Sequence, residues 1–434
     1  MLTTRGWLTT IASLFVAIFS YGFIRAWGNY FTEILNHVNS SRETGEFYQK
    51  QDIQATSSFI LAGVSIGATT CGLILPKIGN KLATILSGIV ITAGYLLFSF
   101  SVKHSEGLLF KIYPISFVLI GMPMGIMHTA CQNSIKEAVP KEHRGFAMTL
   151  FSAGNTVGPF IFPDLFTFFY ETFGIVRALA FTGCLFVLIC VVGTQLKNTT
   201  SEKPKFFDTE LLGQKQYYIY VIHAAFGMAA YFGTFTFLPN YCESVLENNF
   251  DMGARNLTSF QIKSEITSQR NSIQKVLTGV EGLGRILGMF IADRFQKESI
   301  LQVVYLGLII AWSIFAILPS VTTIIPEVYF LYSGSSLAGL CTGCFTGILF
   351  ALLVDVVPNE KHAVGAAMNQ LVLGIANFGS IFVMSRGMLW SLKFPYYLSI
   401  GYYVLAFVLL RLVRKYNDER LKGQESAEME SLNH

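Results

Sequence analysis

Twelve apolar runs, most of them about 20 residues long, alternate with polar segments along this chain of 434 residues. They cover approximately residues 7–35, 55–76, 82–101, 108–138, 145–170, 176–196, 217–246, 272–292, 300–320, 328–357, 362–388 and 390–413. A run of this length matches the thickness of a bilayer, and a helix satisfies every backbone amide within its own segment. The pattern therefore predicts an all-α integral membrane protein with twelve transmembrane helices.

The composition excludes the main soluble classes of protein. Hydrophobic residues make up 52% of the chain and charged residues only 13%, and the mean hydropathy is +0.50. Soluble domains carry about 25% charged residues. The 31 basic and 27 acidic residues are balanced and form no basic cluster, so we expect a lipid bilayer and no nucleic acid as partner.

The runs fall into two sets of six that are separated by a polar stretch. Basic turns follow the second and eighth runs, at residues 72–81 and 288–297, and long polar segments follow the first and seventh runs. Matching positions in two halves indicate an internal duplication. We expect two pseudo-symmetric six-helix bundles at residues 1–196 and 217–413, a cytoplasmic linker at 197–216 and a cytoplasmic tail at 414–434.

The distribution of Lys and Arg predicts the orientation. With both termini in the cytoplasm, 17 basic residues lie on the inner side and 11 on the outer side, in agreement with the positive-inside rule. The glycosylation sequons at Asn39 and Asn256 then fall in long outer loops, whereas the sequon at Asn198 falls in the linker. The sequence therefore predicts a multi-pass glycoprotein with both termini cytoplasmic.

Two six-span halves with a basic turn after spans two and eight resemble the major facilitator superfamily. A finer resemblance, to the monocarboxylate transporter family, rests on four stretches in spans one, four to five, eight and ten to eleven. They are Phe19-Ser-Tyr-Gly-Phe-Ile-Arg25 with Tyr30-Phe-Thr-Glu-Ile34, Arg144-Gly-Phe-Ala147 with Ala153-Gly-Asn-Thr-Val-Gly158, Val280-Glu-Gly-Leu-Gly-Arg285, and Val354-Asp-Val-Val357 with Ala363-Val-Gly365. The chain departs from the family at Thr4-Arg5-Gly6-Trp7 and Thr149, so it is identified as a divergent member.

The resemblance implies a secondary transporter of the plasma membrane that moves a small monocarboxylate, an organic anion, together with a proton by alternating access. It also implies a single-span accessory glycoprotein as partner. Lactate carriers of this family have Lys where this chain has Arg25 and Asp where it has Glu281, which leaves the identity of the carboxylate open. Phe345 lies in span ten, where the family has pocket residues.

Three ionisable residues, Arg25, Glu281 and Arg285, lie well inside predicted spans. A charge at the bilayer centre costs about 2.5 to 3.5 kcal/mol, so such residues are functional by default. Glu281 and Arg285 share one helix face in the order that favours an ion pair. We expect Arg285 to bind the substrate carboxylate and Glu281 to take the coupling proton, with a purely structural ion pair as the alternative. Arg25 either binds substrate or reaches the outer headgroups as an anchor.

Other polar and aromatic residues are weaker candidates. Tyr21 and Phe345 could line a pocket, although most aromatic residues in a chain with 38 Phe pack in the core or face lipid. His128 begins a polar stripe with residues 129, 132 and 133, and it is either a proton relay or a satisfied interhelical histidine. Asp164 either lines the cavity or reaches the outer interface, and we expect Asp355 to make gate or cap contacts.

No Walker-type loop, His-Glu-x-x-His motif or His/Cys cluster occurs in the sequence. We therefore expect no ATP-driven transport, no enzyme, no metal and no cofactor. Two alternative functions stay open: a proton-independent facilitative carrier of larger carboxylates such as aromatic amino acids, and a non-transporting sensor or scaffold on the same fold. The short tail offers no signalling domain and midplane charge favours transport, so the transporter is the leading hypothesis.

Overall fold

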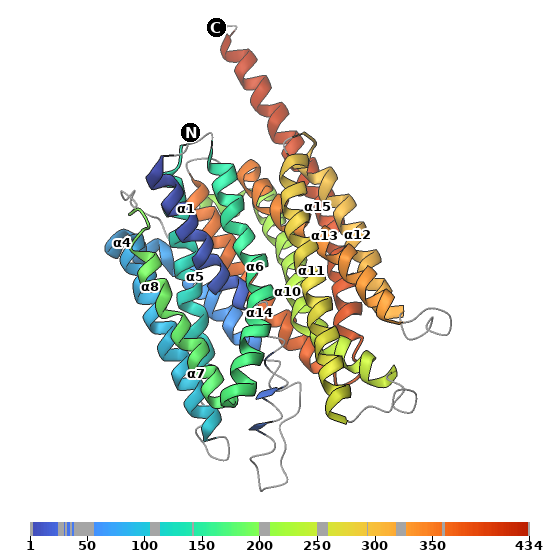
Figure 1. Ribbon diagram of the computed structural model, residues 1–434. Helices are drawn as coiled ribbons and strands as arrows, with labels where there is room; N and C mark the ends of the chain where they lie inside the picture. Colours follow the sequence, from blue (N-terminus) through green and yellow to red (C-terminus); the bar gives the residue numbers. More distant parts are fainter. Residues whose placement is uncertain are drawn as a thin grey trace.

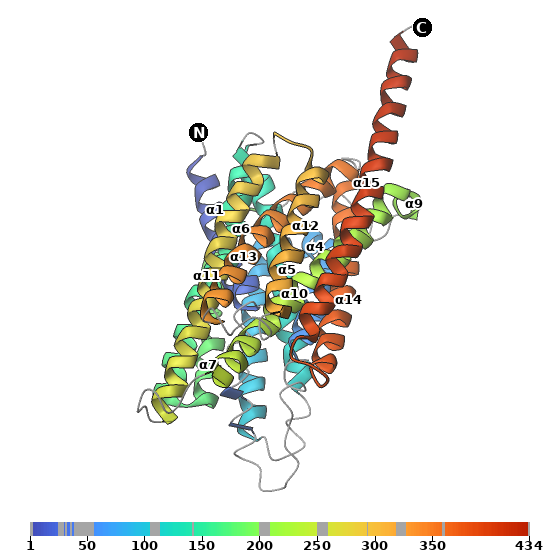
Figure 2. The same ribbon diagram turned by 90° about the vertical axis from the view of Figure 1, so that its right-hand side faces the viewer.

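The structure is a computed structural model (Figures 1 and 2). It describes residues 3–24, 30, 33–34, 37–38, 56–104, 113–140, 143–198, 209–249, 259–292, 294–317, 327–357 and 361–432. Every regular element within these ranges is helical. The helices are α1 Thr4–Ala17, η1 Ile18–Gly22, α4 Thr56–Lys103, α5 Tyr113–Ala138, α6 Arg144–Phe173, α7 Ile175–Leu185, α8 Val187–Gly193, α9 Thr209–Gly213, α10 Lys215–Asn249, α11 Ser259–Ala292, α12 Lys297–Ile317, α13 Glu327–Val356, α14 His362–Gly387 and α15 Phe394–Leu432.

Each of the twelve predicted runs overlaps a helix, although α4 spans both the second and third runs and α7 and α8 share the sixth. Eight helical segments of the described residues are long and apolar enough to cross a membrane, and one of them, Ser58–Lys103, contains the second and third runs. The first, fifth and eighth runs correspond to α1, α6 and α11, which lie alongside the others in Figure 1. These three fall outside the apolar set because α1 is only 14 residues long and because α6 and α11 carry polar and charged residues.

A break in α4 at Gly79 confirms the predicted tight turn between the second and third runs. Gly79 has φ 76° and ψ 162°, a conformation that residues with a Cβ rarely adopt. The start of the linker stabilises this turn, because the Lys81 amide donates to Asn198 Oδ1 at 3.1 Å and Asn80 donates to the Lys197 carbonyl at 2.8 Å. The sequon residue Asn198 is thus engaged in the turn, whereas Asn39 and Asn256 lie outside the described residues.

The helices form two groups that lie side by side in Figure 1. Helices α1 and α4 to α8 pack together in the first group, and α10 to α15 pack together in the second. The groups meet where α4 packs against α14 and where α6 packs against α11. The second spanning helix of each group therefore contacts the fifth spanning helix of the other, as a two-fold pseudo-symmetric arrangement requires.

The two ends of the described chain lie at the same end of the bundle, together with the linker and the Gly79 turn (Figures 1 and 2). We call this end the linker face and the opposite end the far face. The short helix α9 packs on the linker face of the second group, where Lys361 forms an ion pair of 2.6 Å with Glu210. Helix α15 continues past the predicted end of the last run to Leu432, because Glu, Lys, Arg, Ala and Met all favour helix beyond the apolar segment.

Large apolar side chains cover the outside of the bundle. Val303, Val191 and Phe290, for example, are 69%, 67% and 66% exposed. Polar side chains, in contrast, are buried between the helices, among them Glu281, Asn369 and His223. This inside-out distribution suits a protein surrounded by lipid and concentrates its polar chemistry at the centre.

Candidate functional site

The centre of the site is an ion pair on α11. Arg285 Nη2 lies 2.9 Å from Glu281 Oε1, and Arg285 Nε donates to the same oxygen at 3.3 Å. Glu281 is fully buried and Arg285 is only 8% exposed. The two residues are one helical turn apart, so local helix geometry is sufficient to bring them together.

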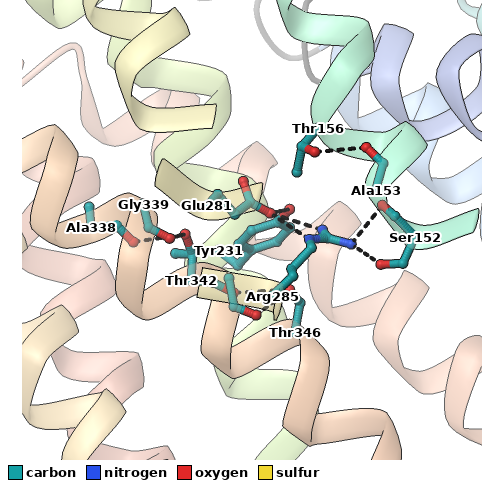
Figure 3. Close-up of polar contacts among 11 residues, drawn as sticks. Ser152, Ala153, Thr156, Tyr231, Glu281, Arg285, Ala338, Gly339, Thr342 and Thr346 are labelled. Atoms are coloured by element: carbon teal, nitrogen blue, oxygen red, sulfur yellow. Dashed lines mark hydrogen bonds and ion pairs between the residues drawn. The ribbon is translucent and has the colours of Figure 1, made fainter. Parts of the chain in front are cut away.

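Tyr231 of α10 holds the other side of the glutamate. Its hydroxyl group donates to Glu281 Oε1 at 3.1 Å, and its side chain is almost fully buried. Figure 3 shows the tyrosine ring reaching across from the neighbouring helix toward the Glu281 carboxylate. One oxygen of the buried carboxylate thus accepts hydrogen bonds from three donor groups, Arg285 Nε, Arg285 Nη2 and the Tyr231 hydroxyl.

Ser152 of α6 brings the first group of helices to the same arginine. Arg285 Nη1 donates to the Ser152 carbonyl oxygen at 3.2 Å and also to the Ser152 hydroxyl oxygen. The guanidinium therefore connects the two groups of helices, with Glu281 on one side and Ser152 on the other (Figure 3). Ser152 is half-buried.

Close glycine contacts fix the backbone that carries the ion pair. A Cβ on Gly343 of α13 would lie 2.7 Å from the Arg285 amide nitrogen and 2.8 Å from Gly284 Cα, and closer still to the Glu281 carbonyl oxygen. Contacts of this length require that α13 present no side chain there. Gly284 of α11 likewise faces the backbone of α13, so glycines on both helices allow the close approach.

Aromatic side chains of the first group of helices lie on one side of the arginine. His128 of α5 interacts electrostatically with Arg285, and its ring lies 4.4 Å from the ring of Tyr21 and 4.6 Å from that of Phe151, between centroids. Tyr21 belongs to the π-helical turn η1 and also lies 6.4 Å from the ring of Phe232 on α10. The structure thus brings Tyr21 and His128 to the same centre as Arg285.

The remaining predicted residues lie elsewhere. Phe345 is fully buried against Gly227 of α10 and lies 5.6 Å, between ring centroids, from Tyr305 of α12, within the packed second group. Asp355 forms an ion pair of 2.6 Å with Lys297 at the linker face. Arg25 lies outside the described residues.

Asp164 reaches the far end of the contact between the two groups. Its carboxylate lies 2.7 Å from Lys275 Nζ, and the two side chains are 57% and 34% exposed. This ion pair connects α6 with α11, the same two helices that Ser152 and Arg285 connect nearer the centre. Asp164 therefore lies at an exposed rim and does not line the buried centre.

Sequence reasoning missed Tyr231 and Ser152. Both partners are remote from the ion pair along the chain, with 50 residues between Tyr231 and Glu281 and 133 between Ser152 and Arg285. Tyr231 is one of 19 tyrosines and stands in an apolar run without a distinguishing motif. A weak signal for Ser152 was its position directly before the Ala153–Gly158 stretch that carries the family resemblance.

The arrangement can bind an anion and can take up a proton. Arg285 offers donors to a carboxylate, and Glu281 becomes neutral when protonated, which releases the guanidinium from its partner. Among the described residues, no group of three His, Cys, Asp or Glu side chains is arranged to hold a metal ion.

Relatives known from sequence are membrane transporters. Monocarboxylate transporter 9 from Mus musculus is 26% identical over 196 residues, which are 44% of this chain and 35% of that protein. Monocarboxylate transporter 7 from Homo sapiens is 22% identical over 197 residues, 44% of this chain and 34% of that protein. The chain thus spans about a third of the length of these two relatives. The MFS-type transporter pynF from Aspergillus niger is 20% identical over 87% of this chain and 80% of its own length.

Solved structures and a family model agree on the fold. The xylose transporter XylE from E. coli, in a partially occluded inward open conformation, has a TM-score of 0.69 at 13% identity, with 93% of this chain and 98% of that chain covered. A D-xylose-proton symporter has a TM-score of 0.66 at 13% identity, over 93% and 97%. The model of the Major Facilitator Superfamily matches residues 9–324. The chain therefore belongs to the major facilitator superfamily of membrane transporters, within which it resembles the monocarboxylate transporters.

Proposed function

We propose that this transporter moves a small monocarboxylate across the plasma membrane together with a proton, by alternating access. The single observation that carries the proposal is the position of Arg285. Its buried guanidinium is shared between Glu281 in its own half and Ser152 in the other half. A carboxylate substrate is the simplest ligand that could replace either partner, because it offers the same type of oxygen acceptor.

The proton and the anion would be coupled through the same arginine. When Glu281 accepts a proton it loses its negative charge, and the attraction that holds Arg285 to it weakens. The guanidinium is then available to a substrate carboxylate, which restores charge balance at the buried site. Binding of the anion is therefore favourable when the proton is bound, and an unpaired charge would oppose either event alone.

The contacts of Arg285 with both halves would connect binding to movement. A substrate that displaces Ser152 removes two hydrogen bonds between α6 and α11, which changes how strongly the halves hold each other. In this conformation the halves also meet toward the far face, at Asp164–Lys275 and where the rings of Phe59 and Phe378 lie 5.7 Å apart. We propose that the far face is extracellular and is closed here, and that the linker face is cytoplasmic.

The names of the relatives support the same substrate class, since two of them are monocarboxylate transporters. Tyr21 and His128 are proposed to line the substrate site beside Arg285. Arg25 and Phe345 remain predictions as substrate-binding residues, and so do the division into bundles at residues 1–196 and 217–413 and a single-span accessory glycoprotein.

Uptake in transport-null cells tests the proposal. Labelled lactate, pyruvate and aromatic amino acids would be offered at two external pH values to cells that carry the wild type, Arg285→Lys, Arg285→Ala or Glu281→Gln. Arg411→Ala is a matched control, because this exposed arginine on α15 stacks 5.0 Å above the Phe407 ring, away from the site. Surface biotinylation would normalise each rate to the amount of protein at the surface.

We expect at least one acid to be taken up faster at acidic external pH, with Arg285→Ala inactive and Arg411→Ala unaffected. Arg285→Lys should retain part of the activity, since lysine keeps the positive charge but cannot form a bidentate hydrogen bond with a carboxylate. Uptake that is indifferent to Arg285 would refute the assigned site. Uptake that needs Arg285 but ignores pH in the wild type would favour the proton-independent carrier of larger carboxylates.

A further inference from the structure

A second group of buried polar side chains lies in the C-terminal half, apart from the ion pair. It consists of Asn240 on α10, Gln274 on α11 and Ser335 on α13, which are 1%, 1% and 0% exposed. We call these three residues the amide cluster. In the part of the chain that the structure describes, neither amide nor the serine hydroxyl has a hydrogen-bond partner.

Helix register places the three side chains at one depth. The site contacts provide the reference level, because Tyr231 of α10 and Gly343 of α13 both contact Glu281 of α11 there. The members of the amide cluster lie nine, seven and eight residues farther toward the far face on these helices. At 1.5 Å per residue this is about 13, 10 and 12 Å, so the three agree within one helical turn.

The side chains also point in compatible directions. Gln274 and Glu281 are seven residues apart, two helical turns, and therefore share one face of α11. Asn240 is one turn from Glu243, whose carboxylate reaches α11 to pair with Arg270 at 3.2 Å. Ser335 is seven residues from Thr342, which Figure 3 shows beside Glu281 and Tyr231. Helices α10, α11 and α13 pack against one another, so the three buried side chains come from helices in mutual contact.

The cluster lies between two buried ion pairs. Toward the linker face is Glu281–Arg285, and toward the far face is Glu243–Arg270, with Arg270 only 4% exposed. Arg270 Nε, one turn from Gln274, is a further buried donor without a partner among the described residues. The amide cluster and Arg270 therefore contribute six buried polar atoms that have no protein partner among the described residues.

Such atoms are almost always satisfied by water when protein groups do not reach them. Among the described residues, the two amides are not hydrogen-bonded to each other or to another protein group. A bridging water needs two to four polar partners, which the two amides and the Ser335 hydroxyl would supply. Thr278 extends this row of polar groups from the amide cluster toward Glu281. Its buried hydroxyl group lies four residues after Gln274 and three before Glu281, and its oxygen keeps lone pairs free to accept hydrogen bonds.

We propose that the amide cluster holds a group of ordered waters that conducts protons between the far face and Glu281, inside the C-terminal half and separate from the path of the substrate. This inference rests on the proposed role of Glu281 as the proton acceptor. A proton that leaves a water at Glu243–Arg270 is passed along hydrogen bonds of the enclosed waters, and the last water gives its proton to a Glu281 carboxylate oxygen. One charge enters, the carboxylate becomes neutral, and no other reactant is needed.

The charged and titratable groups around Glu281 are consistent with delivery of the proton from the far face. Arg285 on its own helix and Tyr231 on α10 donate to its carboxylate, and Tyr403 on α15 interacts with it electrostatically. From the first half, His128 interacts electrostatically with Arg285. Helix α13 contributes glycine and threonine at this level together with two cysteines. The Cys341 thiol lies against Gly307 of α12, and the Cys344 thiol donates to the Gly284 carbonyl oxygen.

Apolar substitutions in the cluster test the route. Gln274→Met and Ser335→Ala would be reconstituted into liposomes and compared with matched controls one turn or one residue away. Gln269→Met replaces a half-buried glutamine that is bonded to Glu265 at 2.9 Å, and Ser336→Ala replaces a serine bonded to the Tyr332 carbonyl at 2.8 Å. Two rates would be measured with an acid from the uptake panel, lactate or pyruvate: uptake driven by a pH gradient, and exchange at equal pH on both sides.

We expect Gln274→Met and Ser335→Ala to lower the pH-driven rate at least about tenfold while exchange stays within twofold, because exchange needs no new proton. Their melting temperatures should not fall, since each change removes a buried polar group without a protein partner. The control variants should match the wild type in both rates.

The inference would be overturned if both cluster variants kept a normal pH-driven uptake rate while Glu281→Gln had lost pH-driven uptake. If Glu281→Gln itself keeps the pH-driven rate, the proposed function has failed and the water route fails with it. Should a variant not fold, hydroxyl-radical labelling of the wild type gives the answer, because radicals formed at bound waters modify nearby side chains. Labelling of residues 271–278 on α11 is expected, and an unlabelled segment would refute the enclosed waters.

Discussion

A methyl group on Gly343 should displace the ion pair without changing any polar group. In Gly343→Ala the new Cβ would lie 2.7 Å from the Arg285 amide nitrogen, whereas ordinary contacts begin at 3.4 Å. Helix α11 must therefore move away from α13 by about 0.7 Å. The new Cβ would lie even closer to the Glu281 carbonyl oxygen, which requires a larger shift. Overpacking of this kind costs about 1–3 kcal/mol, and a displacement of about 1 Å at a functional site can lower the rate about 100-fold.

Gly347→Ala is the matched control, one turn along the same helix. Its Cβ would lie 3.5 Å from the Arg285 carbonyl oxygen, an ordinary contact. Thermal unfolding in detergent and uptake at acidic external pH would be measured for both variants. We expect Gly343→Ala to unfold at a lower temperature and to lose at least nine-tenths of the uptake, with Gly347→Ala close to the wild type. Equal behaviour of the two variants would refute the reasoning that the backbone of α13 positions Arg285 and Glu281.

Three further substitutions test the partners of the ion pair and the contact between the halves. Tyr231→Phe removes the hydroxyl that donates to Glu281 at 3.1 Å but keeps the ring, so stability should fall by about 1.5–3 kcal/mol and the pH dependence of uptake should shift; an unchanged pH profile would contradict the assignment. Asp164→Asn, compared with Lys275→Gln, breaks an exposed ion pair and should change stability by less than about 1 kcal/mol. Asp164→Asn and Lys275→Gln should nevertheless each increase the rate at which a thiol reagent added at the far face labels a cysteine placed at Thr156. Labelling at the same rate as without these substitutions would argue against closure of the far face.

The sequence predicts the parts of the fold that depend on local properties. Span length follows from hydropathy, and the turn at Gly79 follows from a short polar break between two apolar runs. The Glu281–Arg285 pair is equally local, because a spacing of four residues on a helix is enough to bring the charges together. The start of α11 at Ser259 was missed by 13 residues, since its first turns are polar and hydropathy detects only the apolar part of a helix.

The contacts between helices could not be predicted in the same way. Whether Tyr231 or another tyrosine of α10 reaches Glu281 depends on the rotation of that helix and on the glycines that set its distance from its neighbours. The same holds for Ser152 and for the amide cluster, whose members come from three helices. Phe345 shows the same dependence on helix rotation. Its helix passes the site, but its ring packs against Gly227 of α10.

The most direct test of the central claim is to count protons and substrate in the same vesicle. Liposomes that contain the purified transporter and a trapped pH indicator would receive a labelled acid from the uptake panel, and the internal pH and the internal label would be followed together. The account predicts one proton per carboxylate for the wild type, and for Glu281→Gln an exchange of label without acidification. Acidification that persists in Glu281→Gln at the wild-type ratio would contradict the account, because the proton would then travel without the group assigned to carry it.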